Sequence, residues 1–231
     1  MRDLRVFKGV VLDPEADATT IQVMAGAAEM RDGVDHVPVE LRSDSTLHAR
    51  AVVELAHAPT AADPSREPLP TGSFTASPAD AYADGRLFHG PDMHAIANVE
   101  TCDAAGIIGR STPPPAPSQW IARPMRSAWL ADPIALDAAF QLMILWSHHH
   151  RGVPSLPTAV GHYQQFRALP RDGVRIIARI TKDTEHAAEA TIEFVDDAGR
   201  LVAQIERYEC VLDASLRDAF KHNQLLEHAA T

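Results

Sequence analysis

The sequence has little positive charge and few cysteines. Its 21 Lys and Arg residues, of which only three are lysines, stand against 31 Asp and Glu residues, and the formal net charge is −10. Nucleic acids and anionic lipids are bound mainly through clustered cations, so we expect no nucleic-acid partner. The two cysteines, Cys102 and Cys210, lie far apart and match no metal or redox spacing. The sequence therefore predicts free thiols in a reducing compartment and no metal site.

The sequence also lacks an apolar run long enough to span a membrane, and its first residues, Met-Arg-Asp-Leu-Arg-Val-Phe-Lys, lack the apolar centre of a signal peptide. We therefore expect a cytoplasmic protein that does not bind a membrane. What the sequence does have is a hydrophobic content of 45% over 231 residues. That content suffices for a sizeable core in one large domain or two small ones.

The strongest local signal is a helix beginning at Pro133. Asp132 can cap it, and proline suits the first helical position. Apolar side chains follow on all sides of the helix, which predicts a buried helix over residues 133–148. Asp137 and Gln141 are the polar residues within it, and their i, i+4 spacing puts them on one face.

That polar face is the candidate for chemistry. A carboxylic acid among apolar groups has a raised pKa and can donate a proton, and Gln141 could hold the acid or a substrate oxygen in place. The same pattern also fits a structural role, in which Asp137 only caps or anchors a neighbouring loop. Composition leaves both interpretations open.

Strands fill most of the remaining chain. Residues 4–55 have the pattern of short antiparallel strands without a helix, with turns at Asp13-Pro14 and Asp32-Gly33. The apolar face of such a sheet must be covered by another part of the chain or by another chain. The prolines of residues 57–72 predict a linker. Six further strands are predicted, at residues 96–101, 106–110, 159–169, 174–182, 187–195 and 201–212, before a polar helical tail.

An antiparallel sheet wrapped around one long buried helix is an α+β fold of the hotdog type. The sequence also contains three motifs: Leu87-Phe-His-Gly-Pro91 followed by Met93, then Leu136-Asp137-Ala-Ala-Phe-Gln141, then Ser155-Leu-Pro157. In this order and spacing they resemble the second half of the dehydratase domain of polyketide synthases and the related domains of polyunsaturated fatty acid synthases. Family members are double hotdogs. The resemblance implies a partial N-terminal hotdog over residues 1–56, a linker over 57–72, a C-terminal hotdog over 73–213 and a polar tail over 214–231.

The resemblance also implies an activity: elimination of water from a 3-hydroxyacyl thioester to give the 2-enoyl thioester. Asp137 would be the catalytic acid and Gln141 its orienting partner. The substrate would arrive on the phosphopantetheine of an acyl carrier protein, with no metal or redox cofactor. Neighbouring synthase domains would be further partners, and a homodimer stays open. The residues implied to border the substrate are Tyr82, Leu87, Phe88, His89, Gly90, Pro91 and Met93.

The chain departs from the family at the catalytic base, which the family carries in a His-x-x-x-Gly-x-x-x-x-Pro motif of the first hotdog. His36, His48 and His57 lack the required glycine. A match that begins at His148 lies in the other half, about 16 Å along the helix from Asp137, and we interpret it as chance. We therefore expect the chain alone to be nearly inactive. A non-catalytic dehydratase-like scaffold module is the alternative, and a hotdog thioesterase is a third hypothesis.

Two other histidines are interpreted as non-catalytic or left undecided. His89, beside the Gly-Pro bend, fits a structural role better than catalysis. His162 and Tyr163 are neighbours on a predicted strand, so only one of them can face the core.

Overall fold

The computed structural model describes residues 1–11, 18–56 and 62–217. Five strands come first in the chain, then two short helices and six further strands arranged around one long helix. The elements are β1 (Arg2–Val6), β2 (Gln22–Ala25), β3 (Glu29–Arg31), β4 (Val34–Ser43), β5 (Thr46–Leu55), α1 (Pro78–Ala83), the 3₁₀ turn η1 (Pro91–Met93), β6 (Ile96–Asp103), β7 (Gly106–Ser111), α2 (Pro117–Trp120), α3 (Pro133–Arg151), β8 (Ser155–Gln165), β9 (Arg175–Asp183), β10 (Ala187–Val195) and β11 (Leu201–Leu212).

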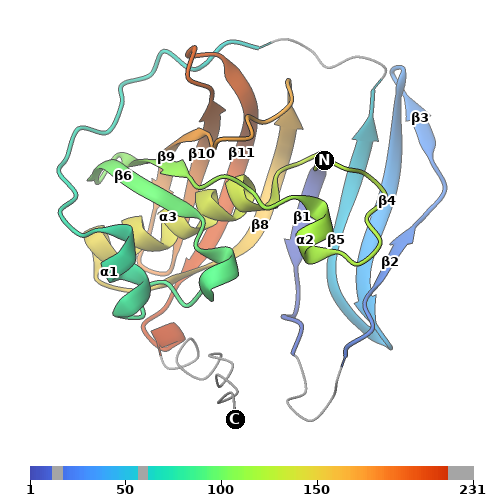
Figure 1. The fold of residues 1–231 in the computed structure, drawn as a ribbon, viewed down its shortest axis with the longest axis horizontal. Helices are drawn as coiled ribbons and strands as arrows, with labels where there is room; N and C mark the ends of the chain where they lie inside the picture. Colours follow the sequence, from blue (N-terminus) through green and yellow to red (C-terminus); the bar gives the residue numbers. More distant parts are fainter. Residues whose placement is uncertain (12–17, 57–61, 218–231) are drawn as a thin grey trace.

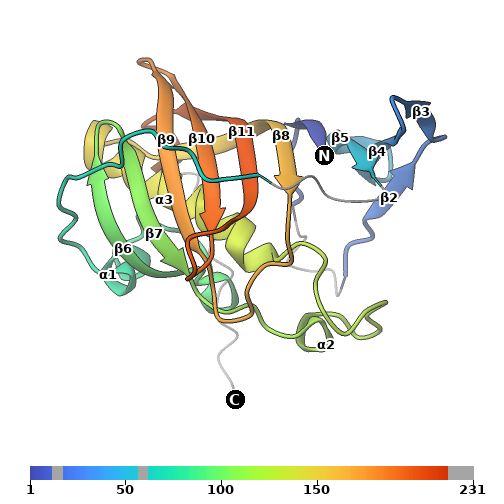
Figure 2. The same ribbon diagram turned by 90° about the horizontal axis from the view of Figure 1, so that it is seen from above.

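All these strands belong to one antiparallel sheet with the order β2-β4-β5-β1-β8-β11-β10-β9-β7-β6, and β3 pairs with β4. β1 lies between β5 and β8, and therefore joins the N-terminal strands to the rest of the sheet. The strands from β8 to β6 curve around α3 (Figures 1 and 2). The division predicted at residues 57–72 stays a prediction, since the sheet continues from β5 through β1 to β8.

Helix α3 forms where the sequence predicts it. Asp132 Oδ1 accepts hydrogen bonds from the N–H groups of Ile134 (2.9 Å) and Ala135 (3.2 Å), so it caps the helix. The helix ends at Arg151, three residues beyond the predicted end, because Gly152 is the residue that adopts the left-handed conformation (φ 70°). Most of its side chains are buried.

The core lies between α3 and the concave face of the surrounding strands. The buried rings of Trp146, Phe194 and Tyr208 are among its largest members. The indole N–H of Trp146 donates to the carbonyl of Asp103 (3.0 Å), so its polar atom is satisfied. A side chain at Gly109 of β7 would collide with the α3 side chain packed on it, since an added Cβ would lie 2.8 Å from Leu142. This glycine permits close packing of the helix on the sheet.

The strands β1–β5 have the uncovered apolar side chains that the sequence predicts. They lie to one side of α3, which does not run along them (Figures 1 and 2). Val23 is 74% exposed and Met30 is 71% exposed.

In the described part of the chain, no helix is both long enough and apolar enough to cross a membrane.

Several predicted boundaries are corrected. The first strand ends at Val6, because the N–H groups of Phe7 and Lys8 both turn to the carbonyl of His48 and end the ladder. The eighth strand begins at Ser155, before the predicted residue 159. The three-residue strand β3 is not predicted by the sequence. The turn Asp13-Pro14, His57, residues 57–61 of the linker and residues 218–231 of the tail lie outside the described residues.

Residues 62–72, the described part of the predicted linker, cross the outer face of the sheet (Figure 2). The Ser65 N–H donates to Glu193 Oε1 (2.6 Å), and Arg179 Nε donates to the Pro68 carbonyl (3.4 Å). Glu193 and Arg179 form a buried ion pair of 2.7 Å. The linker is thus attached to β9 and β10 by charged side chains.

Candidate active site

Asp137 lies near the start of α3 and is half-buried, with its side chain 24% exposed. Burial raises the pKa of its carboxyl group, whereas His89 and the hydrogen bond from Gln141 lower it, and burial prevails. The acid is therefore a better proton donor near neutral pH than an exposed aspartate. It keeps some access to solvent, so it is less completely enclosed than the sequence suggests.

Gln141 is fully buried and holds Asp137 through a fixed amide orientation. Its Nε2 donates to Asp137 Oδ2 (2.5 Å) and to the Met93 carbonyl (2.8 Å). Its Oε1 accepts a hydrogen bond from the hydroxyl of Tyr82 (2.5 Å), which in turn accepts one from the Ile96 N–H (3.2 Å). Because the Met93 carbonyl can only accept hydrogen bonds, the amide cannot reverse without losing bonds. Burial raises the pKa of Tyr82 to about 12, so it remains a donor at neutral pH.

The segment from α1 to β6 brings Tyr82 and Met93 to the helix. Ser77 and Asp80 form a capping box that starts α1. The buried Leu87 anchors the chain after α1, and its N–H donates to the Ala81 carbonyl (2.9 Å). The Gly-Pro bend then starts η1, which directs the carbonyl of Met93 toward Gln141.

His89 lies beside the acid. Its Nε2 is 3.6 Å from Asp137 Oδ2, its ring stacks on Phe88 at a centroid distance of 4.3 Å, and its side chain is 13% exposed. Burial lowers the pKa of the imidazole, Asp137 raises it, and His94 lowers it. The sequence interpretation of His89 as structural did not foresee this contact, because the contact depends on how the Gly-Pro segment folds back on α3.

The remaining predicted site residues differ in their surroundings. Leu87 is buried in the core, Phe88 and Met93 are half-buried, and Gly90 and Pro91 are exposed. Their contact with a substrate stays a prediction.

The other histidines lie elsewhere. His148 is on the last turn of α3, far from Asp137 along the helix. His48 is a buried strand residue bonded to Ser43 Oγ (2.7 Å) and to the Lys8 carbonyl (3.0 Å). Tyr163 packs against the core, whereas His162 faces the other side, which decides the alternative left open by the sequence.

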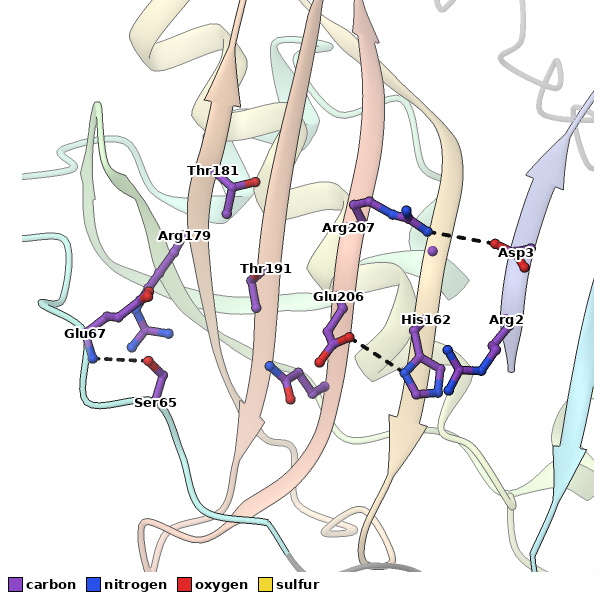
Figure 3. A pocket seen from close by; sticks show the side chains of 12 residues that line it. Arg2, Asp3, Ser65, Glu67, His162, Arg179, Thr181, Thr191, Glu206 and Arg207 are labelled. Carbon is purple, nitrogen blue, oxygen red and sulfur yellow. Dashed lines mark hydrogen bonds and ion pairs between the residues drawn. The ribbon is translucent and has the colours of Figure 1, made fainter. Parts of the chain in front are cut away.

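Asp137 and Gln141 line neither of two hollows on the surface of the described residues. One, of about 650 Å³, lies on the outer face of the sheet between His162, Glu206, Arg207 and Arg179 (Figure 3). The other, of about 810 Å³, lies beside β8 and the segment around Trp129. The charges of the first are largely paired, as in the contacts of His162 with Glu206 (3.8 Å) and Arg207 with Asp3 (3.8 Å). Within the described ranges, no three His, Cys, Asp or Glu side chains gather in a way that could hold a metal ion.

Comparison with known proteins decides the family. The family model described as "Polyketide synthase dehydratase N-terminal domain" matches residues 57–212. The chain belongs to this family. It is 28% identical over 177 residues to a polyunsaturated fatty acid synthase polypeptide of Thraustochytrium sp., a match that covers 74% of this chain and 6% of that protein. The chain therefore spans only a small part of that relative. It is a dehydratase domain of the polyketide or polyunsaturated fatty acid synthase type.

Solved structures of polyketide synthase dehydratases have the same fold. The dehydratase domain from the CurF module of curacin polyketide synthase matches with a TM-score of 0.67 at 19% identity, over 92% of this chain and 74% of that chain. The dehydratase domain of RzxB from Pseudomonas fluorescens matches with a TM-score of 0.63 at 14% identity, over 90% of this chain and 74% of that chain. These likenesses confirm the predicted hotdog fold.

Proposed function

We propose that this dehydratase domain removes water from a 3-hydroxyacyl thioester and that Asp137 is the acid that protonates the departing hydroxyl. The observation that carries the proposal is a half-buried carboxyl group whose pKa is raised by burial and whose Oδ2 is held by Gln141. Among the described residues, hydrogen bonds to Asp137 reach only Oδ2. Oδ1 is then the oxygen that carries the proton and gives it to the substrate.

The substrate class follows from the family and from the surroundings of the acid. The segment of Tyr82 and residues 87–93 borders Asp137 and would line the path of an acyl chain. The thioester would be carried on the phosphopantetheine of an acyl carrier protein, with neighbouring synthase domains as further partners. The reaction needs two proton transfers and no redox step, so we propose no cofactor for the domain itself.

Two solved structures of one relative support the assignment of an acid. CurK dehydratase structures described as inactive mutants carry a histidine replaced by phenylalanine in one case and an aspartate replaced by asparagine in the other. In that protein, one imidazole and one carboxyl group are therefore both required. By analogy, Asp137 is the carboxyl group of this chain.

The test is dehydration of the N-acetylcysteamine thioester of 3-hydroxyhexanoic acid, followed by mass spectrometry. Asn is nearly isosteric with Asp but carries no transferable acid proton, so Asp137→Asn should lower the rate by about 10²- to 10⁴-fold. Asp183→Asn, which changes a carboxylate bound to Arg151 and His150 at the other end of α3, is the matched control and should keep the wild-type rate. An active wild type matched by a fully active, folded Asp137→Asn would remove Asp137 from the mechanism. A wild type without activity would favour the scaffold alternative.

A further inference from the structure

His48 lies in a bulge of strand β5, where its backbone is held in place by the segment that follows β1. The pairing of β4 with β5 shifts by one residue between Leu41 and Arg42, and His48 is the extra residue on β5. Its carbonyl accepts hydrogen bonds from the N–H groups of Phe7 (2.8 Å) and Lys8 (3.3 Å). A bulge re-aims a side chain, and such features are frequent next to active sites.

The two ring nitrogens of His48 have different partners, and these partners determine the position of the proton. Nδ1 lies 3.0 Å from the carbonyl oxygen of Lys8, which can only accept a hydrogen bond. We therefore assign the imidazole proton to Nδ1, which leaves the lone pair on Nε2. Ser43 Oγ lies 2.7 Å from Nε2, so the serine hydroxyl donates to the imidazole. A hydroxyl, a base and a third group that orients the base are the parts of an activated nucleophile.

Ser43 occupies the edge of the surface, with its base behind it. It is the last paired residue of β4, opposite Thr46, and the turn of Asp44 and Ser45 follows. Asp44 adopts a left-handed conformation (φ 46°), which makes the turn sharp. Ser43 is half-buried and both turn residues are exposed, whereas His48 is only 5% exposed. A reagent can thus approach the hydroxyl from solvent while the imidazole stays shielded.

We propose that Ser43 and His48 form a nucleophilic site that accepts the acyl group of a short-chain thioester or activated ester. Ser43 is the nucleophile, His48 is its general base, and the Lys8 carbonyl orients the imidazole. Ser43 lines neither of the two surface hollows, so the site suits small acyl groups. This activity goes beyond dehydration and does not involve Asp137.

The atoms and protons balance over two steps. Ser43 Oγ bonds to the thioester carbonyl carbon while its proton passes to His48 Nε2. The C–S bond then breaks, and the leaving sulfur takes that proton, which gives a free thiol and an ester on Ser43. In the second step Nε2 takes a proton from water, and the hydroxide attacks the ester carbonyl. The C–Oγ bond breaks, Oγ recovers the proton from Nε2, and a carboxylic acid is released.

A fluorophosphonate tests the nucleophile, because an activated serine attacks its phosphorus and displaces fluoride. The 231-residue chain is incubated with diisopropyl fluorophosphate, and the modified peptide is identified by mass spectrometry. We expect the label on Ser43, and Ser43→Ala should lose it. Ser45→Ala removes an exposed hydroxyl of the same hairpin and is the matched control, which should keep the wild-type rate. Absence of label on Ser43 in the wild type would overturn the proposal.

His48→Asn tests the base. The amide nitrogen of asparagine takes the place of Nδ1 and can still donate to the Lys8 carbonyl, but nothing replaces Nε2. Labelling of Ser43 should therefore fall by about 10²- to 10⁴-fold, with thermal unfolding as the check that the variant is folded. A folded His48→Asn that is labelled at the wild-type rate would show that His48 only holds the hairpin together, and the proposal would be wrong.

A thiol at the position of the nucleophile tests the same pair without changing His48. An adjacent imidazole lowers the pKa of a thiol, so Ser43→Cys should react with iodoacetamide at least about tenfold faster than Ser45→Cys. Exposure alone predicts the opposite order, because Ser45 is the more exposed position. The native Cys102 and Cys210 are each 1% exposed and should not contribute. Equal rates, or a slower Ser43→Cys, would overturn the proposal even if His48→Asn fails to fold.

The acyl-transfer step itself is tested with the N-acetylcysteamine thioester of acetic acid, and the released thiol is measured with a chromogenic disulfide. Wild type should release thiol faster than Ser43→Ala, and Ser45→Ala should match wild type. This thioester has no 3-hydroxyl, so its cleavage is independent of the proposed dehydration. Equal release by wild type and Ser43→Ala would exclude acyl transfer at this site.

Discussion

Tyr82→Phe tests whether the hydrogen-bond network around Gln141 determines the position and acidity of Asp137. The hydroxyl of Tyr82 donates to Gln141 Oε1 (2.5 Å) and accepts from the Ile96 N–H (3.2 Å). Gln141 is fully buried and Ile96 is 4% exposed, so water cannot readily replace the lost partner. The substitution removes one oxygen atom and leaves two buried polar groups without a bond.

The expected loss of stability follows from that count. Each buried group left unpaired costs about 1–3 kcal/mol, so the unfolding free energy should fall by about 2–6 kcal/mol. For a chain of this length, about 2–4 °C of Tm is lost per kcal/mol, which corresponds to a Tm decrease of about 4–24 °C. Tyr163→Phe is the matched control, because the Tyr163 hydroxyl makes one half-buried hydrogen bond, to Gln165 Oε1 (2.9 Å). It should cost about 1 kcal/mol.

Urea unfolding followed by tryptophan fluorescence measures both variants, and the pH profile of dehydration measures the site. The amide of Gln141, once free to turn, bonds less to Asp137, and that bond lowers the pKa of the acid. The pKa of Asp137 should therefore rise in Tyr82→Phe, which moves the alkaline limb of the profile to higher pH. Equal stability losses in the two tyrosine variants, together with an unchanged profile, would refute the reasoning.

Three further predictions concern stability. Asp137→Asn should raise the unfolding free energy at pH 7. The folded-state pKa of Asp137 lies above its unfolded value of about 3.9, so the wild type loses stability as the pH rises from the unfolded to the folded pKa. Urea titrations in which the stability difference between variant and wild type does not grow over this pH range would contradict the prediction. Glu193→Leu leaves the buried Arg179 without its ion-pair partner and should lower the unfolding free energy by about 3–5 kcal/mol. Arg179→Met combined with Glu193→Leu should lower it by less, and a larger loss of stability in this double variant would contradict the prediction. Gly161→Ala places a Cβ 2.5 Å from Arg207 Nε and should cost about 1–2 kcal/mol, an effect that thermal unfolding should find relieved in the Arg207→Ala background.

The parts of the fold that depend on neighbouring residues could be predicted from the sequence. The cap at Asp132, the buried helix and the pairing of Asp137 with Gln141 all lie within one helix. The last two strands, Ala187–Val195 and Leu201–Leu212, have the predicted boundaries because their alternating pattern and the turn between them are local as well.

The rest of the site depends on contacts between distant parts of the chain. Gln141 bonds to Tyr82 and to the carbonyl of Met93, which lie 59 and 48 residues away. A backbone carbonyl leaves no signal in residue type, so Met93 could be placed near the substrate only by the resemblance to a family. The proximity of His89 to Asp137 likewise depends on how the Gly-Pro segment packs on α3. Local periodicity carries no information about such contacts.

The position of β1 has a consequence for synthesis of the chain. This strand lies near residue 1, yet it pairs with β8, whose registered partners include Ala159 and His162. At a translation rate of about 5–20 residues per second, the ribosome needs about 8–32 s after β1 to complete its partner. During that interval one edge of β1 has no strand to pair with, and the apolar side chains of β2 and β3 are already outside the ribosome. Nascent chains should therefore need protection by chaperones until β8 has been synthesised.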